Sequence, residues 1–226
     1  MQPIQSIRGI AAPLLADNID TDQIIPVHRM LASMNPDYGA GLFANWRYLA
    51  DGTPNSDFIL NNEPFTRAQI LIAGANFGCG SSREHAVWAL NGFGIRCVIA
   101  ASFGDIFFSN CIRRGLLLVA LPSIQIRDLE SRIVSSGGRE PLTVSLVDRT
   151  IQLVGGADIA FSIDDGVRAT LLEGLDEIGH TLRYLESIEA HEREDRGARP
   201  WVYATVPVSS NNCTEITSSP VQRGHE

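Results

Sequence analysis

Short apolar runs alternate with amphipathic segments through the middle of the chain. The runs at 69–74 (QILIAG), 96–100 (RCVIA) and 116–121 (LLLVAL) have the length and composition of buried strands. Residues 83–92 place apolar side chains on one helical face, and a second helix is expected to begin near Ser102. This strand–helix–strand–helix–strand order predicts an α/β unit with a parallel sheet.

Further elements are expected on both sides of this unit. Residues 4–15 have a strand pattern, and the apolar positions between 42 and 49 indicate one short helix. Residues 123–136 have a helical pattern. The segments 142–146 and 150–154 alternate as the two strands of a hairpin do.

The C-terminal third changes character twice. Residues 164–190 are expected to be helical, with breaks near Gly174 and Gly179, a cap at Asp164 or Asp165 and a second cap at Thr181. From about residue 190 the chain is charge-dense, and from Pro200 it is rich in Ser, Asn, Thr and Pro without an amphipathic period. The sequence therefore predicts a domain over residues 1–190, followed by a charged linker and disordered tail over residues 191–226.

Charge and composition narrow the classes of function. The net charge of −8 over 226 residues gives no electrostatic footprint for nucleic acid or anionic lipid. No apolar run approaches the roughly 20 residues that span a bilayer, and we recognise no targeting segment. The four cysteines form no Cys-x-x-Cys pair. We expect a cytoplasmic protein with free thiols that binds neither nucleic acid nor membrane.

The segment Gly74–His85 (GANFGCGSSREH) carries the strongest chemical signal. It lies between an expected strand and an expected helix, where the backbone N–H groups of a glycine-rich turn can approach an anion. Arg83 adds a guanidinium that matches a carboxylate, and Ser81 and Ser82 add hydroxyls. A carboxylate or phosphate site and a simple capped turn, with Ser82 as N-cap, explain this pattern about equally well.

Better-known glycine motifs do not fit this segment. No Gly-Lys-Ser/Thr follows the glycines, so it is not a Walker loop. Arg83 stands where a dinucleotide fingerprint has its third glycine. The Gly-x-Ser-x-Gly pattern of a nucleophile elbow is also missing.

Three segments in this order resemble the small-subunit family of 3-isopropylmalate dehydratases, within the aconitase superfamily. They are Asp20–Pro26 (DTDQIIP), Asn76–His85 (NFGCGSSREH) and Ser102–Phe107 (SFGDIF), and the resemblance covers about residues 5–190. It implies a swivelling β/β/α domain of the α/β class, with a mixed, partly parallel sheet flanked by helices. It also implies a partner large subunit that carries a [4Fe–4S] cluster, with no cofactor or metal site in this chain.

The implied reaction interconverts 2- and 3-isopropylmalate by dehydration and rehydration in leucine biosynthesis. Its substrate is a dicarboxylate, and the chain is expected to be inactive without the large subunit. The resemblance makes Ser81, as an alkoxide, the base that acts next to a carboxylate, and it assigns Asp22 and Arg83 to the catalytic site. It also implies that Ser82 and Gly80 bind a substrate carboxylate with Arg83.

Several neighbouring residues have competing interpretations. Arg47 could reach over the site as a second carboxylate clamp, although a solvated helix arginine is the more common case. Asp20 could belong to the site or cap a turn. Glu84 favours the helix dipole in any case, and His85 is interpreted as a structural histidine. We interpret Cys79 as no cluster ligand, because a cluster needs several thiolates.

The stretch Val27–Gly39 departs from the family pattern. Bacterial members usually have Lys-Gln-Phe-Leu and Arg-Thr-Gly-Phe-Gly where this chain has Val27–Met30 and Asn35–Gly39. A related 2-hydroxy diacid of the citramalate or homoaconitate type is therefore an alternative substrate. A non-catalytic anion-binding module is a second alternative, and the acidic charge argues against an RNA-binding regulator.

Overall fold

The computed structural model describes residues 1–30 and 37–203 of the chain. By its internal contacts the chain divides into two compact units, Met1–His180 and a second unit that begins at Thr181. We describe each unit by itself. No helix in the described ranges is long and apolar enough to cross a membrane.

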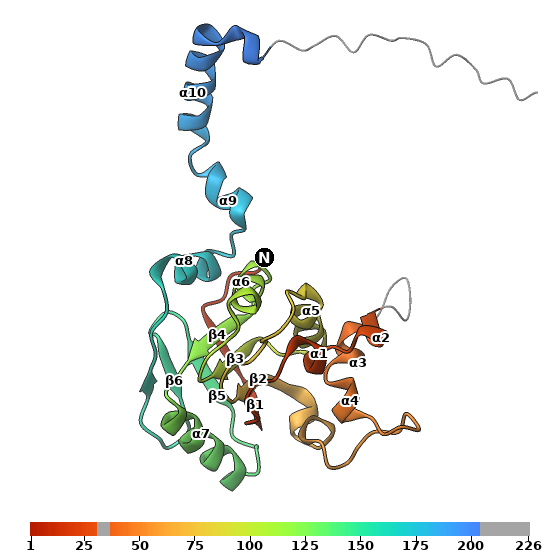
Figure 1. The fold of residues 1–226 in the computed structure, drawn as a ribbon. Coiled ribbons are helices and arrows are strands. Elements are labelled where there is room, and N and C mark those ends of the chain that lie inside the picture. The colour runs from red at the N-terminus through yellow and green to blue at the C-terminus, as the bar shows by residue number, and fades with distance from the viewer. Residues whose placement is uncertain (31–36, 204–226) are drawn as a thin grey trace, which may run out of the picture. The chain divides into compact units, whose positions relative to one another are not determined.

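One mixed seven-stranded sheet forms the centre of the first unit, within the described residues. Its strands are β1 Ser6–Leu14, β2 Ala68–Ala73, β3 Cys97–Ala100, β4 Leu117–Ala120, β5 Leu142–Ser145, β6 Thr150–Gln152 and β7 Ile159–Ala160. The order across the sheet is β4-β3-β2-β1-β5-β6-β7 (Figure 1). The four strands β1 to β4 are parallel, and β5 to β7 continue the sheet from β1 in antiparallel pairs.

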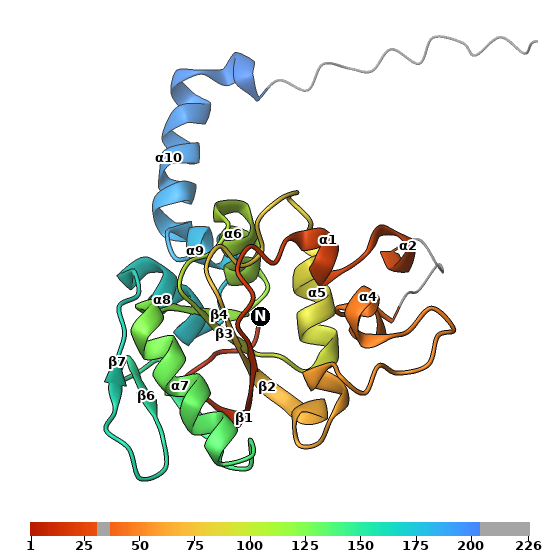
Figure 2. The same ribbon diagram turned by 60° about the horizontal axis from the view of Figure 1, so that its bottom comes forward.

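Helices connect and cover these strands. The α-helices are α1 Thr21–Ile24, α2 Val27–Met30, α3 Tyr38–Gly41, α4 Ala44–Arg47, α5 Glu84–Phe93, α6 Asp105–Arg113, α7 Ser123–Ser135, α8 Asp165–Glu173, α9 Glu177–Leu182 and α10 Leu185–Ala198. Short 3₁₀ turns are η1 Ile59–Asn61, η2 Phe65–Arg67 and η3 Pro200–Val202. Figure 2 shows α5 and α7 on opposite sides of the strands.

Side-chain alternation along the strands explains this two-sided cover. In β2, Ile70 and Ile72 belong to the apolar cluster that includes α7, whereas Leu71 and Ala73 belong to the cluster that includes α5. All four are fully buried. A parallel strand that is covered on both faces needs apolar side chains on both faces, which is why this segment reads as one uninterrupted apolar run.

Most of the expected elements are present, and the antiparallel hairpin pairs Val144 with Ile151. The mixed, partly parallel α/β fold is confirmed. Two expectations in the C-terminal third are wrong, because Gly179 and Thr181 lie inside α9 rather than at a break and a cap. The Asp176 side chain accepts a hydrogen bond from the Gly179 backbone N–H at 2.7 Å. This bond caps the N-terminus of α9, so the helix begins before Gly179 and includes it.

The composition change near residue 190 does not coincide with the end of an element. The predicted domain boundary there falls inside α10, whereas the two compact units divide after His180. Much of the segment interpreted as a charged linker is therefore helical. The predicted tail beyond residue 203 and the residues 31–36 of the Val27–Gly39 stretch lie outside the described residues.

Candidate functional site

The Gly74–His85 loop connects β2 to α5, as the sequence predicted, and two other segments of the chain hold its backbone. The Gly78 N–H donates to the carbonyl of Ile19 at 2.7 Å. The Phe77 N–H donates to the carbonyl of Ser102 at 3.0 Å, and its own carbonyl accepts from the Gly104 N–H at 3.0 Å. The Thr21 N–H also donates to the carbonyl of Cys79 at 2.9 Å, so backbone hydrogen bonds join the three segments of the sequence resemblance around one loop.

Two glycines give the loop its shape. Gly78 has φ 75° and Gly80 has φ 92°, a region that other residues rarely adopt. A Cβ atom on Gly78 would lie 2.3 Å from the ring of Phe107, so the ring packs where a side chain would otherwise stand. The first turn of α6 therefore closes against the loop.

The helix α1 is fixed to the same loop through its cap. The Asp20 carboxylate accepts from the Gln23 N–H at 2.7 Å, and the Gln23 side chain accepts from the Asp20 N–H at 2.9 Å, which forms a capping box. Buried Thr21 donates its N–H to the carbonyl of Cys79 and its hydroxyl to the carbonyl of Ser81. Asp20 is thus the N-cap of α1, whereas the next acidic residue, Asp22, takes no part in the cap.

Asp22 and Arg83 form an ion pair across this junction, although they are 61 positions apart in the sequence. The Arg83 side chain is 23% exposed and that of Asp22 is 54% exposed. A pair this exposed contributes only about 0–1 kcal/mol to stability. Its main consequence is positional, because it brings two of the three predicted catalytic residues into contact at the start of α5.

Ser81 and Ser82 lie exposed on the rim of the loop, beside this ion pair in sequence. A hollow of about 250 Å³ is lined by residues Gly78–Ser81 of the loop and Gly104–Phe107 at the start of α6. The N-terminus of the ten-residue helix α5 begins directly after Arg83 and adds partial positive charge there. Hydroxyls, backbone amides, a guanidinium and a helix N-terminus together suit a carboxylate ligand.

His85 packs in an aromatic cluster. Its ring lies 4.8 Å from the Trp88 ring and 5.7 Å from the Tyr38 ring, measured between centroids. The Arg114 guanidinium stacks over Trp88 at 5.6 Å and forms an ion pair with Glu84. These contacts brace the first turns of α5, which agrees with a structural part for His85.

Arg47, which the sequence offered as a second carboxylate clamp or as a solvated helix arginine, forms its hydrogen bonds within the 39–61 segment. It donates to the carbonyl of Gly39 at 3.1 Å, to the carbonyl of Leu42 at 3.3 Å and to the Asn61 side chain at 3.2 Å. Its guanidinium also lies 4.9 Å from the Phe93 ring, and burial lowers its pKa below the usual value. These contacts join the 39–61 segment and leave Arg47 outside the group that Asp22, Ser81, Ser82 and Arg83 form.

The described cysteines do not suit an iron–sulfur cluster. Cys97 and Cys111 are buried in the core, and burial raises the pKa of both thiols. Cys79 is half-buried in the loop, and Cys213 lies outside the described residues. Within residues 1–30 and 37–203, no group of three or more His, Cys, Asp or Glu side chains could hold a metal ion.

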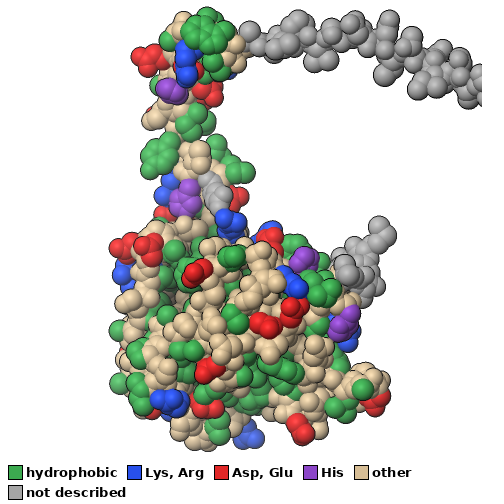
Figure 3. Space-filling model, viewed as in Figure 1, with side chains coloured by type: hydrophobic (Ala, Val, Ile, Leu, Met, Phe, Trp, Pro, Cys, Tyr) green, Lys and Arg blue, Asp and Glu red, His purple; other side chains and the backbone are tan. Residues whose placement is uncertain are grey.

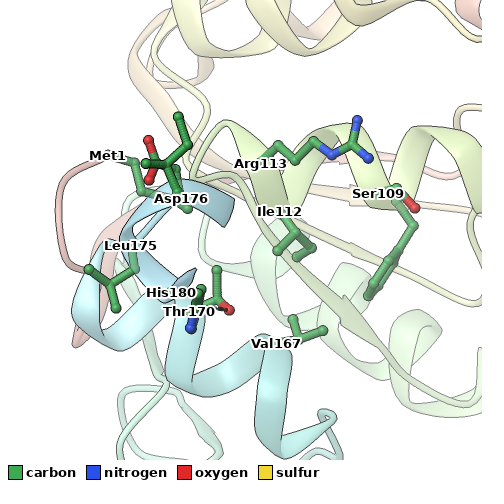
Figure 4. A pocket seen from close by; sticks show the side chains of 11 residues that line it. Met1, Ser109, Ile112, Arg113, Val167, Thr170, Leu175, Asp176 and His180 are labelled. Carbon is green, nitrogen blue, oxygen red and sulfur yellow. Dashed lines mark hydrogen bonds between the residues drawn. The ribbon is translucent and has the colours of Figure 1, made fainter. Parts of the chain in front are cut away.

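A second hollow, of about 500 Å³, was not foreseen from the sequence. Figure 4 shows Ile112 of α6 facing Val167 and Thr170 of α8 across it. The Thr170 hydroxyl donates to the carbonyl of Gly166 at 2.9 Å, and its oxygen lies 2.8 Å from Nε2 of His180, with which it shares a hydrogen bond. The hollow lies along the C-terminal half of α6, whereas the loop contacts the first turn of that helix.

Known proteins that resemble this chain belong to the family that the sequence resemblance indicated. Residues 1–123 match the family model of the aconitase C-terminal domain. A 3-isopropylmalate dehydratase small subunit from Cupriavidus necator is 47% identical over 205 residues, which are 90% of this chain and 99% of that protein. One from Rhodospirillum rubrum is 48% identical over 202 residues, 89% of this chain and 97% of that protein.

A solved structure supports the same assignment. The crystal structure of a 3-isopropylmalate dehydratase from Methanocaldococcus jannaschii has a TM-score of 0.58 and 25% identity, and it covers 83% of this chain and 99% of that one. The family match over residues 1–123 includes the four parallel strands, the Gly74–His85 loop and both residues of the Asp22–Arg83 ion pair. The chain belongs to the 3-isopropylmalate dehydratase small-subunit family, whose fold is that of the aconitase C-terminal domain.

Proposed function

We propose that the chain is the small subunit of a cytoplasmic hydro-lyase that isomerises 2- and 3-isopropylmalate in leucine biosynthesis, with Ser81 as the base. The observation that carries the proposal is the contact between Asp22 and Arg83 on the rim that also holds Ser81 and Ser82. The names of the relatives supply the reaction and the substrate.

Substrate binding begins with an exchange of carboxylates on Arg83. Asp22 occupies the guanidinium in this structure. A substrate carboxylate of the same charge displaces it, and the fork of Arg83 binds the two oxygens side by side. The hydroxyl of Ser82 and the backbone N–H of Gly80 complete the carboxylate site.

Ser81 then removes the proton from the carbon next to that carboxylate. A serine is a base only as an alkoxide, so its anion has to be stabilised strongly. The loop amides, the N-terminus of α5 and Arg83 supply positive potential, which is strongest once a partner excludes water. Rehydration uses the same group in reverse, and the proton returns from Ser81 to carbon.

The remaining part of the reaction belongs to the partner. The proposed large subunit carries a [4Fe–4S] cluster that acts as the Lewis acid for the leaving hydroxyl. The described residues of this chain offer no group for that task. Neither chain alone therefore holds the complete set of reacting groups.

Specificity for the isopropyl side chain of the substrate is the most detailed part of the proposal, because the Val27–Gly39 stretch differs from the usual family sequence. The Asp37 carboxylate accepts a hydrogen bond from the Ala40 N–H at 3.0 Å and caps the N-terminus of α3. This cap explains the acidic residue at position 37 without a contact to substrate. Tyr38 packs against His85 and Trp88. A citramalate- or homoaconitate-type diacid remains the alternative substrate for the same chemistry.

The test is turnover by the complex of the full chain with its cluster-loaded large subunit, followed anaerobically through the absorbance of the alkene formed. Ser81→Ala should lower kcat by about 10²–10⁴-fold, the range of a lost general base. Its KM should stay near that of the wild type. Ser135→Ala, an exposed serine on α7, is the matched control and should leave both constants unchanged.

Each other result has a clear meaning. Turnover of citramalate or a longer diacid, but not of isopropylmalate, would keep the base and change the substrate. A loaded complex that turns over no diacid would favour a non-catalytic anion-binding module. Full activity of Ser81→Ala would remove Ser81 as the base.

A further inference from the structure

Thr21 is a buried polar residue that contacts the Gly74–His85 loop at two points. It is the first residue of α1 and is 1% exposed. Its N–H donates to the carbonyl of Cys79 at 2.9 Å, and its hydroxyl donates to the carbonyl of Ser81 at 3.1 Å. Buried hydroxyls are normally hydrogen-bonded. The acceptor of this one is the backbone of the proposed base.

The Ser81 carbonyl accepts hydrogen bonds from two donors. Besides the Thr21 hydroxyl, the Arg83 N–H donates to it at 2.8 Å across a tight turn centred on Ser82. A carbonyl oxygen has two lone pairs, so these two donors occupy both. Rotation of the Ser81–Ser82 peptide would break both hydrogen bonds at once. The orientation of this peptide is therefore fixed.

This orientation decides where the Ser82 N–H points. The Ser81–Ser82 peptide is trans, and the carbonyl and the N–H of a planar trans peptide point in opposite directions. The carbonyl faces buried Thr21, so the N–H faces the exposed side of the loop. Within residues 1–30 and 37–203 this N–H has no acceptor. It is therefore available to a ligand.

The groups around this N–H suit an anionic ligand. Arg83 follows Ser82 directly, and α5 begins after Arg83 with the partial positive charge of a helix N-terminus. Figure 3 shows acidic and basic side chains close together over α1 and the start of α5, where Asp22 pairs with Arg83. A carboxylate that displaces Asp22 therefore lies beside the Ser82 N–H as well.

We propose that Thr21 is a positioning residue for the dehydration, and this rests on the proposed function. Its hydroxyl holds the Ser81–Ser82 peptide so that the Ser82 N–H donates to the substrate carboxylate beside Arg83. The same hydrogen bond keeps the partial negative charge of the Ser81 carbonyl oxygen turned away from the alkoxide that Ser81 forms. Thr21 itself touches neither the substrate nor the reacting atoms.

The kinetic test compares two substitutions in the complex of the full chain with its cluster-loaded large subunit. Thr21→Val keeps the shape of the side chain but loses the hydroxyl. Its kcat/KM for 3-isopropylmalate should fall about 100-fold, as expected when reacting groups are slightly misplaced. Thr21→Ser keeps the hydroxyl and should retain most of the activity. Equal losses in both variants would assign the effect to packing of the methyl group and overturn the proposal.

Ser145→Ala is the matched control for stability. Ser145, in β5, is also buried, and its hydroxyl donates to Asp148 at 2.7 Å. Ser145→Ala and Thr21→Val each remove a buried hydrogen bond, so both should lower the melting temperature. Only Thr21→Val should lower kcat/KM at a temperature at which both variants are folded. Equal activity of the two variants would contradict a positioning role for Thr21.

Nuclear magnetic resonance of the full chain alone gives a readout that does not depend on turnover. The carbonyl carbon signal of Ser81 reports its hydrogen bonds, so it should move in Thr21→Val and stay in place in Thr21→Ser and Ser145→Ala. During titration with 3-isopropylmalate, the Ser82 amide signal should move in the wild type and respond less in Thr21→Val. An unchanged Ser81 signal in Thr21→Val, or a Ser82 amide signal that does not respond in the wild type, would overturn the proposal.

Failure of the proposed function would give a different result. A cluster-loaded wild-type complex that turns over no diacid would contradict the hydro-lyase activity. The Ser81 and Ser82 signals would still decide whether Thr21 orients the loop for a carboxylate.

Discussion

At the scale of single residues, the site depends on which of two nearby aspartates caps a helix and which one contacts Arg83. Asp20 and Asp22 have the same chemistry two positions apart, and only the structure separates their tasks. Asp20 closes a capping box with Gln23, whereas Asp22 reaches Arg83. Arg83 is thereby held at the loop by a carboxylate, the same group that the proposed substrate offers.

Arg83→Lys tests this carboxylate exchange. An ammonium group keeps the charge but loses the two-pronged geometry, so KM should rise about 10–100-fold, as expected for one lost charge-assisted hydrogen bond. The melting temperature should stay within about 2 °C, because an exposed ion pair stabilises little. Arg67→Lys, which alters the exposed pair with Glu63, serves as the control. An unchanged KM for Arg83→Lys would argue against the carboxylate site.

At the scale of elements, periodicity predicted most of the fold. The apolar runs of β2, β3 and β4 could be recognised because strands covered on both faces contain apolar residues without interruption. Short elements gave weaker signals. β7 has two residues and was missed, and α9 was misjudged because Asp176 starts a helix that continues through Gly179.

Apart from the family resemblance, which also pointed to Asp22, the sequence predicted only those members of the site that are neighbours along the chain. Ser81, Ser82 and Arg83 are consecutive in the loop, so their proximity could be predicted without knowing the fold. The contact of Asp22 with Arg83 depends on the hydrogen bonds between α1 and the loop, which no local pattern shows. Arg47 showed the reverse, because its carbonyl partners are placed by the fold and turn it away from the site.

The junction between the loop and α6 gives a prediction about stability. Gly78→Ala places a methyl group against the Phe107 ring in a backbone region that alanine disfavours. We expect it to lower the free energy of unfolding by about 1–3 kcal/mol, measured by denaturant titration. Gly197→Ala in α10 meets no atom within 4 Å and should stabilise slightly or have no effect. Equal stability of both variants would contradict the tight junction.

At the scale of the whole molecule, the hydrophobic core and the exposed residues proposed to be catalytic occupy different places. The apolar clusters on the two faces of the sheet hold the strands together. Phe77 anchors the loop in one of these clusters, whereas Ser81 and Ser82 are exposed. The second unit adds no core of its own in its described residues. The residues that stabilise the fold and those of the proposed site therefore lie in different parts of the first unit.

The buried thiols report on the integrity of this core. Burial raises the pKa of the Cys97 and Cys111 thiols, so they lack the thiolate form that reacts with alkylating agents. Both should stay unmodified by iodoacetamide at pH 8 in the folded protein, read by mass spectrometry of peptides. In denaturant both should react fully. Labelling of either thiol in native buffer would show that the sheet opens locally.

The position of β1 has a consequence for how the chain folds as it is made. This strand is translated before the other strands of the sheet, yet it lies in the interior of the sheet between β2, which ends at Ala73, and β5, which begins at Leu142. Its parallel neighbours can join it while the ribosome is still working. Its other edge stays bare until roughly the next seventy residues have emerged. During that interval the nascent chain presents an unpaired strand edge, which can pair with the edge of another chain.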